Sequence, residues 1–180
     1  MTVPNLITTI RIILAPVFVI YLINDQLLSA LIVFLLCALS DGLDGMVARL
    51  MNQRSKLGAY LDPLADKLLL VAAFVTLSVR GYLPAWLTVL VFSRDTIILL
   101  GVLVLFLNRM EFSIKPTPVS KITTWLQFIT VLAVLSQSYM SSFTKFYPYI
   151  FYLTALLTIS SGLHYMHNWF RMIGEGSAER

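Results

Sequence analysis

Apolar stretches long enough to cross a bilayer recur along almost the whole chain, and they constrain its fold more than any other feature. A helix needs about 17–25 predominantly apolar residues to span the hydrocarbon core. Polar or turn-forming segments separate six such stretches, and the predicted spans are 5–23, 27–47, 59–79, 84–107, 119–137 and 147–169. Only 12% of the residues are charged, against about 25% in soluble domains. We therefore expect an all-α integral membrane protein with six transmembrane helices.

The domain organisation is expected to be simple. The 180 residues contain no internal repeat, linker or second domain, which predicts a single transmembrane domain over 1–180 with a polar, frayed tail at 174–180. No basic residue and no small-residue cleavage site precede Arg11, so the first apolar segment is expected to be retained. The net charge of +4 is modest and the basic residues flank the spans, which argues against a nucleic-acid partner.

The basic residues also predict the orientation. With a cytoplasmic N-terminus, only Arg80 and Lys145 fall in outer loops. Eight basic residues fall on the cytoplasmic side: Arg49, Arg54, Lys56, Arg109, Lys115, Lys121, Arg171 and Arg180. The positive-inside rule therefore places both termini in the cytoplasm. We expect a multi-pass protein of the bacterial cytoplasmic (inner) membrane.

Four aspartates gather in one segment across predicted spans 2 and 3. Asp41 and Asp44 are three residues apart and share a helix face, and Asp62 and Asp66, four apart, share another. An ionised carboxylate at the bilayer centre costs roughly 2.5–3.5 kcal/mol on insertion scales, so an idle cluster is not expected. Carboxylates from facing helices are a common way to build a metal site. Oxygen ligands favour two Mg²⁺ or Mn²⁺ ions, which can flank a phosphoryl-type displacement at the cytoplasmic side of these spans.

Small and basic residues beside the aspartates fit a ligand site. Gly45 and Ala48 leave room for a ligand at the end of span 2, and Gly58 does the same one turn before Asp62. Arg49 is one turn from Gly45 and is placed to pair with phosphate oxygens.

A membrane cation transporter is a non-enzymatic alternative that would use the same carboxylates. It predicts a site at the midplane and inverted repeats. No repeat is visible, and the aspartates lie at helix ends on one side.

The residues of this segment resemble the signature of the CDP-alcohol phosphotransferases, D-x-x-D-G-x-x-A-R-(x)8-G-x-x-x-D-x-x-x-D. Every fixed position is matched, by Asp41, Asp44, Gly45, Ala48, Arg49, Gly58, Asp62 and Asp66. Six spans with the motif across the second and third are also the architecture of that family, so the resemblance covers most of the chain.

The resemblance implies a reaction, site residues and partners. In the family, a phosphatidyl group passes from CDP-diacylglycerol to an alcohol and CMP is released, a step of phospholipid biosynthesis. The four aspartates would hold two divalent ions, and Asp66 would also be the general base. The CDP-binding residues would be Asp41, Asp44, Gly45, Ala48, Arg49 and Gly58. Family members pair through their spans, which implies a homodimer in the lipid bilayer.

A polar stripe near the N-terminus is the first candidate for contact with the acceptor or with phosphate. Asn5, Thr8 and Arg11 are three residues apart on an apolar segment, and the segment looks like the opening of the glycerol-type branch of the family. The stripe either marks an interfacial helix end or faces the site, where Arg11 or Thr8 would contact phosphate or metal-bound water.

A second anionic pocket is predicted in the other half of the chain. Arg94 and Asp95 lie within the fourth span, where they either pair with each other or help to bind the phosphate of the acceptor. Lys115, Ser120 and Lys121 lie near the start of the fifth span and would complete that pocket.

The same positions bear on the acceptor alcohol. Arg94-Asp95 and Ser120-Lys121 depart from the Arg-Glu and Gly-Lys pairs usual in phosphatidylglycerolphosphate synthases. They are similar to the single-active-site cardiolipin synthases, which carry Ser-Arg-Asp followed by Lys-Pro-Thr-x-x-Ser-Lys. This favours phosphatidylglycerol as acceptor, giving cardiolipin. Glycerol-3-phosphate, giving phosphatidylglycerol phosphate, is the main alternative, and an inositol-type acceptor is a third.

Overall fold

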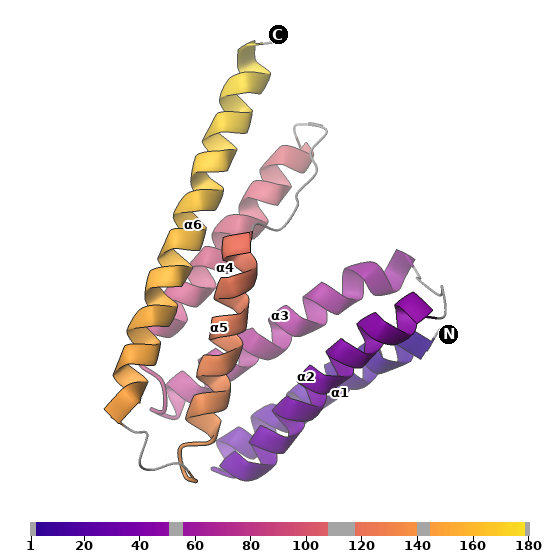
Figure 1. Ribbon diagram of the computed structural model, residues 1–180, viewed down its shortest axis with the longest axis vertical. Coiled ribbons are helices and arrows are strands. Elements are labelled where there is room, and N and C mark those ends of the chain that lie inside the picture. Colours follow the sequence, from indigo (N-terminus) through magenta and orange to yellow (C-terminus); the bar gives the residue numbers. More distant parts are fainter. Residues whose placement is uncertain (1–2, 51–55, 108–117, 140–144, 179–180) are drawn as a thin grey trace. The chain divides into compact units, whose positions relative to one another are not determined.

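The computed structural model describes the backbone of residues 3–50, 56–107, 118–139 and 145–178, and side chains within 10–40, 66–101, 118–139 and 145–169 together with Val104. The described residues form six α-helices (Figure 1). Their bounds are α1 Val3–Ile23, α2 Leu27–Leu50, α3 Lys56–Val79, α4 Ala85–Leu107, α5 Pro118–Leu135 and α6 Tyr147–Ala178. The prediction of an all-α protein is confirmed, and the first five helices begin and end within about three residues of the predicted spans.

The sixth helix differs from its prediction at the C-terminal end. The predicted span stopped at 169 and the tail from 174 was expected to fray, whereas α6 continues to Ala178. Hydropathy marks how long a segment is apolar and does not mark where the helix ends. Met172, Glu175 and Ala178 favour helix.

One described helix is clearly long and apolar enough to cross a membrane. That helix is α5, Pro118–Leu135. The described apolar parts of α1 and α2, Ile10–Ile23 and Leu27–Ser40, are shorter. The structure thus bears out an all-α chain with one clear span, and the count of six spans stays a prediction.

The helices form two compact units, each of which is described by itself. Unit 1 comprises Met1–Leu83 and Val131–Thr144, and unit 2 comprises Pro84–Thr130 and Lys145–Arg180. Helix α5 contributes its first thirteen residues to unit 2 and its end to unit 1.

In unit 1, α1 packs on both α2 and α3 (Figure 1). Apolar side chains at helical spacing form the core, and the aromatic rings of Phe18 and Phe34 lie with centroids 5.5 Å apart. On α1 the buried face carries Arg11, Phe18 and Leu22, which lie seven and then four residues apart. The apolar face of α1 therefore directs Arg11 into the interior of the unit.

Two helix ends are joined at one end of unit 1. Asp25 after α1 and Gly81 after α3 have positive φ of 56° and 76°, and in both cases the next N–H reaches back five residues, as in a Schellman cap. The Asp25 carboxylate accepts hydrogen bonds from Nε of Arg80 at 3.1 Å, from Nη2 of Arg80, and from the Tyr82 hydroxyl at 3.1 Å. These contacts join the C-terminal ends of α1 and α3, which run in the same direction (Figure 1).

In unit 2, α4 packs on α6. Leu87 and Val91 on α4 and Ala155 and Tyr165 on α6 are buried. Nearer the other end of α4, the indole ring of Trp169 lies directly over the backbone of Gly101, because a Cβ at Gly101 would fall 0.5 Å from Cζ2 of that ring. The absence of a side chain at Gly101 therefore admits the Trp169 ring.

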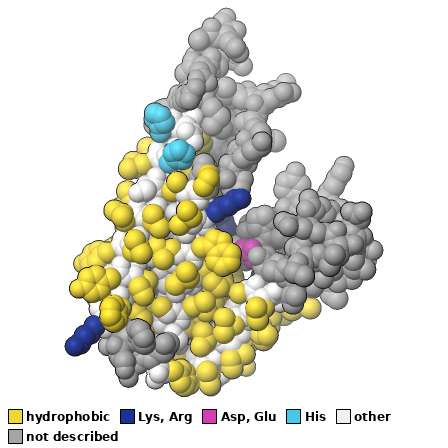
Figure 2. All heavy atoms as spheres, in the orientation of Figure 1, with side chains coloured by type: hydrophobic (Ala, Val, Ile, Leu, Met, Phe, Trp, Pro, Cys, Tyr) yellow, Lys and Arg dark blue, Asp and Glu magenta, His cyan; other side chains and the backbone are white. Residues whose placement is uncertain are grey.

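Large apolar side chains cover much of the described surface (Figure 2). Val79 is 80% exposed, Trp125 71% and Leu99 69%. Soluble monomers rarely expose apolar patches of more than a few hundred Å². A surface of this kind is typical of contact with lipid.

The close approach at Gly101 gives a testable prediction. Gly101→Ala should destabilise the protein by about 1–3 kcal/mol, because the new methyl group overlaps the Trp169 ring and forces it to move. Thermal unfolding in detergent, followed by loss of helical circular dichroism, measures the change. Gly162→Ala is the matched control on α6, since its Cβ would meet Cγ of Arg94 at an ordinary 3.7 Å. Equal melting temperatures for the two variants would show that the Trp169 ring does not lie on Gly101.

Candidate active site

The aspartate motif lies entirely on helices. Asp41 and Asp44 are in the C-terminal part of α2, and Asp62 and Asp66 are in the N-terminal part of α3. The helical spacing on which the shared faces depend is therefore present in the backbone. Of the four side chains, the structure describes that of Asp66.

Most other predicted site residues fall outside the described part. The side chains of Asn5, Thr8, Asp41, Asp44, Gly45, Ala48, Arg49, Gly58 and Asp62 are outside the described residues, as is Lys115 altogether. Their roles stay predictions. Asp66, Arg11, Arg94, Asp95, Ser120 and Lys121 can be placed.

The structure brings Arg11 and Asp66 together from positions 55 residues apart in the sequence. Nη1 of Arg11 on α1 donates to Oδ1 of Asp66 on α3 at 2.5 Å. The Arg11 side chain is 1% exposed, whereas that of Asp66 is 39% exposed. The guanidinium lies inside the unit and the carboxylate lies at its edge.

This ion pair has a consequence for the folded unit. Removing a guanidinium from water is costly, and a paired carboxylate with further hydrogen bonds offsets that cost. A charged hydrogen bond of this kind also limits the orientations of the carboxylate. Asp66 therefore contributes to the burial of Arg11, and Arg11 holds Oδ1 of Asp66 in place.

The chemistry of Asp66 fits a hard divalent cation. Its carboxylate offers oxygen ligands and is accessible at 39% exposure. Among the side chains that the structure describes, no group of three His, Cys, Asp or Glu residues lies close enough to hold a metal ion. The three remaining aspartates of the predicted site lie outside that set, so the metal centre stays a prediction.

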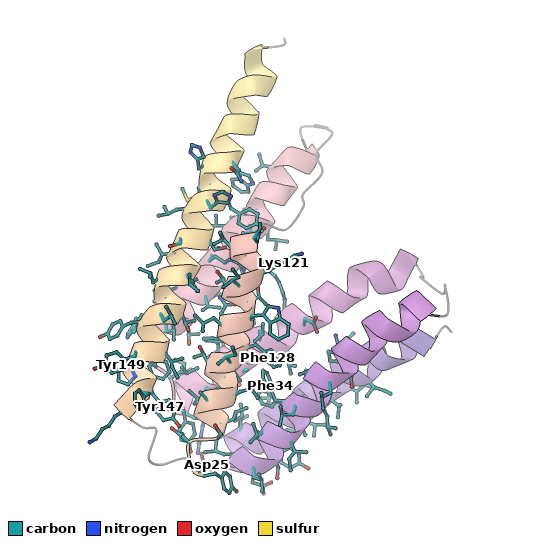
Figure 3. All side chains as sticks on the ribbon, viewed as in Figure 1. Asp25, Phe34, Lys121, Phe128, Tyr147 and Tyr149 are labelled. Atoms are coloured by element: carbon teal, nitrogen blue, oxygen red, sulfur yellow. The ribbon has the colours of Figure 1, made fainter. Side chains whose placement is uncertain are left out.

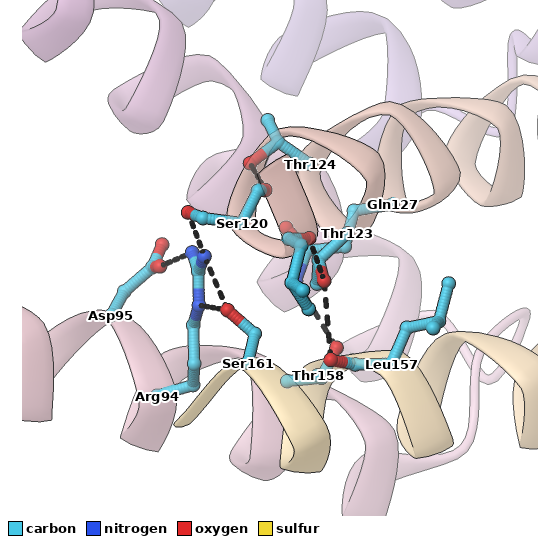
Figure 4. A network of polar contacts seen from close by, with 10 residues as sticks. Arg94, Asp95, Ser120, Thr123, Thr124, Gln127, Leu157, Thr158 and Ser161 are labelled. Carbon is cyan, nitrogen blue, oxygen red and sulfur yellow. Dashed lines mark hydrogen bonds and ion pairs between the residues drawn. The ribbon is translucent and has the colours of Figure 1, made fainter. Parts of the chain in front are cut away.

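Three helices of unit 2 converge on the guanidinium of Arg94 (Figure 4). Nη1 donates to Oδ1 of Asp95 at 2.6 Å, and Nη2 donates to Oγ of Ser120 on α5 at 2.5 Å. Ser161 on α6 accepts from both Nε at 3.3 Å and Nη2 at 3.0 Å. Arg94 is 4% exposed and Asp95 16%. The alternative in which Arg94 and Asp95 pair with each other is thus observed.

Lys121 occupies a different environment from Arg94. It follows Ser120 near the start of α5, and its side chain is exposed, whereas Arg94 is buried (Figure 3). Tyr147 and Tyr149 mark the start of α6, toward the other end of α5 (Figure 3). The structure therefore brings Arg94, Asp95 and Ser120 into one contact network and leaves Lys121 at the surface.

A buried polar seam between α5 and α6 was not predicted. The Thr123 hydroxyl shares its proton between the Val119 carbonyl of its own helix at 2.8 Å and the Leu157 carbonyl at 3.1 Å. Nε2 of Gln127 donates to the Thr158 hydroxyl at 3.3 Å. A third contact joins the hydroxyls of Thr130 and Thr154 at 2.7 Å. The seam residues repeat every three or four positions, and that spacing on both apolar helices is the signal that could have revealed them. Ser161 belongs to the same face of α6 and was missed for the same reason.

The family model for CDP-alcohol phosphatidyltransferases matches residues 1–162. The chain belongs to this family. The match takes in both halves of the aspartate motif, Arg11, and the whole Arg94 network including Ser161. Divalent metal ions are in general use in the family, which agrees with the oxygen ligands of the motif.

Individual relatives carry two different names. The human protein named cardiolipin synthase (CMP-forming) is 36% identical over 183 residues, which cover 92% of this chain and 61% of that protein. CDP-diacylglycerol–glycerol-3-phosphate 3-phosphatidyltransferase of Aquifex aeolicus is 32% identical, over 96% of this chain and 98% of its own length. The Bacillus subtilis protein of the same name is 31% identical, over 92% of this chain and 94% of its own length. The chain thus spans 61% of the length of the human relative.

The unequal burial of Arg11 and Asp66 predicts an asymmetric cost of breaking their ion pair. Asp66→Leu should destabilise the protein by about 3 kcal/mol, because the guanidinium stays buried without this carboxylate. Arg11→Met should cost less, since water can reach Asp66. In the double variant most of the loss should be recovered. Thermal unfolding of all four proteins in detergent measures the cycle, and additive losses would show that the two side chains are not coupled.

Proposed function

We propose that the protein is a metal-dependent transferase of phospholipid biosynthesis. It moves the phosphatidyl group of CDP-diacylglycerol to a glycerol-type alcohol and releases CMP. The observation that carries this proposal is the complete aspartate motif on α2 and α3, in a chain whose residues 1–162 match the family. A cation transporter would bind metal ions without releasing CMP.

The proposed site residues bind metal ions and the nucleotide, and one of the metal ligands, Asp66, also accepts a proton. Asp41, Asp44, Asp62 and Asp66 would hold two divalent ions, Mg²⁺ or Mn²⁺. Gly45, Ala48, Arg49 and Gly58, together with Asp41 and Asp44, would line the CDP pocket. When bound, the ions would neutralise the charge of the pyrophosphate and of the departing CMP.

The chain's own residues supply the proton transfer and the orientation. Asp66 takes the proton of the acceptor hydroxyl while the oxygen of that hydroxyl attacks the phosphatidyl phosphorus. The bond from that phosphorus to the CMP oxygen breaks, and CMP leaves with the bonding electron pair. Arg11 supports this role because it holds Oδ1 of Asp66 at 2.5 Å and so fixes the direction of the carboxylate.

Phosphatidylglycerol is the acceptor that the sequence favours, with cardiolipin as the product. Ser93-Arg94-Asp95 and the segment from Lys115 to Lys121 support it, as does the name of the human relative. Glycerol-3-phosphate remains the second candidate, because the Aquifex and Bacillus relatives are named for it and match this chain over nearly their whole length.

Although Arg94 pairs with Asp95 and is 4% exposed, the positive charge of the Arg94 network and of the exposed Lys121 would attract the phosphate of either acceptor. Arg94 supplies a guanidinium that three helices hold in one orientation, and Lys115 and Lys121 add positive charge near the start of α5. Asn5 and Thr8 on α1 complete the predicted acceptor and phosphate-binding set with Asp95 and Ser120.

A multi-pass arrangement in a bacterial inner membrane supports this chemistry. The proposal comprises six spans, both termini in the cytoplasm, the site on the cytoplasmic side and a homodimer in the bilayer. The apolar exposed surface of both units supports lipid contact. The stacked Trp86 and Tyr152 rings, 5.7 Å apart and both exposed, are typical of side chains at a membrane interface.

Product analysis tests the proposed reaction. The purified protein is incubated with Mg²⁺ or Mn²⁺ and CDP-diacylglycerol, with phosphatidylglycerol in one tube and glycerol-3-phosphate in another. Cardiolipin and CMP from the first tube alone are expected. Phosphatidylglycerol phosphate from the second tube alone would show that glycerol-3-phosphate is the acceptor, and it would leave the aspartate mechanism intact. Absence of CMP from both tubes would overturn the proposed function.

Replacement of the proposed base gives a sharper prediction. Asp66→Asn should abolish CMP release while CDP-diacylglycerol binding stays largely intact, because the amide cannot take the acceptor proton. Asp25→Asn is the matched control in the same unit, at an exposed ion pair about 20 Å along the helix direction from the site. Turnover by Asp66→Asn at the rate of Asp25→Asn would remove Asp66 as the base.

The exposed lysine near the start of α5 tests the acceptor pocket. Lys121→Ala should raise the KM for the acceptor about threefold to tenfold and change that for CDP-diacylglycerol less, since a charged contact contributes about 1 kcal/mol. Lys145→Ala is the control, because it removes an exposed lysine just before α6, away from the Arg94 network. Steady-state kinetics with each substrate varied in turn measure both values. Equal effects on the two KM values would contradict two separate pockets.

A further inference from the structure

Ser161 holds a position that no sequence motif assigned. It lies on α6 with 0% of its side chain exposed, and its hydroxyl oxygen accepts from two nitrogens of Arg94 (Figure 4). Two donors on one edge of a planar guanidinium fix the direction of that plane as well as its distance. Ser161 carries no charge, so it orients Arg94 while Asp95 alone supplies the opposite charge in this network.

The other contacts of Arg94 depend on this orientation. With Nε and Nη2 turned toward Ser161, Nη2 also reaches Ser120 at 2.5 Å and Nη1 reaches Asp95 at 2.6 Å. Ser120 is at the start of α5, next to Lys121. The guanidinium therefore ties the proposed acceptor-binding start of α5 to α4 and α6.

The polar seam of α5 and α6 keeps Ser161 in register with Ser120. Three contacts join the two helices along their length. They are Thr123 with the Leu157 carbonyl, Gln127 with Thr158, and Thr130 with Thr154. The threonine and glutamine side chains of the seam are at least 98% buried. In apolar surroundings such hydrogen bonds resist sliding of one helix past another, because a slip leaves buried polar groups without partners.

We propose that Ser161 is a positioning residue that sets the affinity of the site for the acceptor phosphate by orienting Arg94. This inference rests on the proposed function and extends it to a residue of α6. Ser161 does not touch the reacting atoms. Its loss leaves Arg94 charged and in place on α4, held by Asp95 and Ser120 but without the two contacts that fix the plane of the guanidinium. Acceptor binding therefore weakens and the chemical step does not.

Kinetics of purified variants in mixed micelles test the proposal, with CDP-diacylglycerol and the acceptor each varied. Ser161→Ala should raise the acceptor KM about threefold to tenfold, because Arg94 keeps its contacts with Asp95 and Ser120 and loses only part of its orientation. The KM for CDP-diacylglycerol and kcat should stay within about twofold of the wild type, as a pure positioning role requires. Ser161→Thr keeps the hydroxyl and should restore the acceptor KM.

Two matched controls separate positioning from general loosening of the helices. Ser160→Ala removes an exposed hydroxyl from the neighbouring position on α6, and Gly162→Ala adds a methyl group at an ordinary 3.7 Å from Cγ of Arg94. Both should keep the wild-type acceptor KM. If Ser161→Ala does not fold, Ser161→Cys replaces it, because sulfur is a weak acceptor of similar size.

The outcomes distinguish this inference from the function on which it rests. A wild-type enzyme that releases CMP, with an unchanged acceptor KM in Ser161→Ala, overturns the positioning role alone. Equal increases in both KM values, or the same increase in Ser160→Ala, also overturn it. A wild-type protein that releases no CMP with either acceptor overturns the proposed function itself. Running phosphatidylglycerol and glycerol-3-phosphate in separate arms shows which phosphate Arg94 serves.

Discussion

Burial of positive charge among apolar helices is the constraint on which the rest of this structure depends. Within the described part of the chain, Arg11 in unit 1 and Arg94 in unit 2 are the buried charged residues. Each guanidinium contacts an aspartate, Asp66 and Asp95 respectively. Arg11 thereby joins α1 to α3, whereas Arg94 joins α4 to α5 and α6 through Ser120 and Ser161. A guanidinium without such partners would be very costly in apolar surroundings. The same two ion pairs lie at the residues proposed for proton transfer and for acceptor binding, so fold stability and chemistry share their contacts.

The helices and the aspartate motif could be predicted from sequence because both depend on local spacing. Apolar length located five helices closely and failed at the end of α6, where polar residues continue the helix to Ala178. The contacts between helices could not be predicted in the same way. Arg94 and Asp95 left two alternatives open, and the choice depended on Ser120 and Ser161, which come from two other helices. The pairing of Arg11 with Asp66 likewise depends on how α1 packs against α3, and it joins residues 55 positions apart in the sequence.

The two proposed acceptors make similar demands on the described residues. Phosphatidylglycerol and glycerol-3-phosphate both present a glycerol hydroxyl and a phosphate, and a fixed guanidinium with nearby lysines can bind either phosphate. The distinction lies in what surrounds that phosphate, a lipid diester in one case and a soluble monoester in the other. Relatives of both names match this chain over most of its length. The residues around the acceptor phosphate therefore decide which alcohol is used, whereas the proposed transfer chemistry is the same for both acceptors.

The central claim is that the carboxylates of α2 and α3 form one site for two divalent ions. Titration of the purified protein with Mn²⁺, followed by electron paramagnetic resonance, tests it without relying on turnover. The account predicts saturable binding of two Mn²⁺ per chain, displacement by Mg²⁺, and loss of binding in Asp44→Asn but not in Asp25→Asn. Absence of saturable Mn²⁺ binding, or equal binding by Asp44→Asn and the wild type, would contradict it.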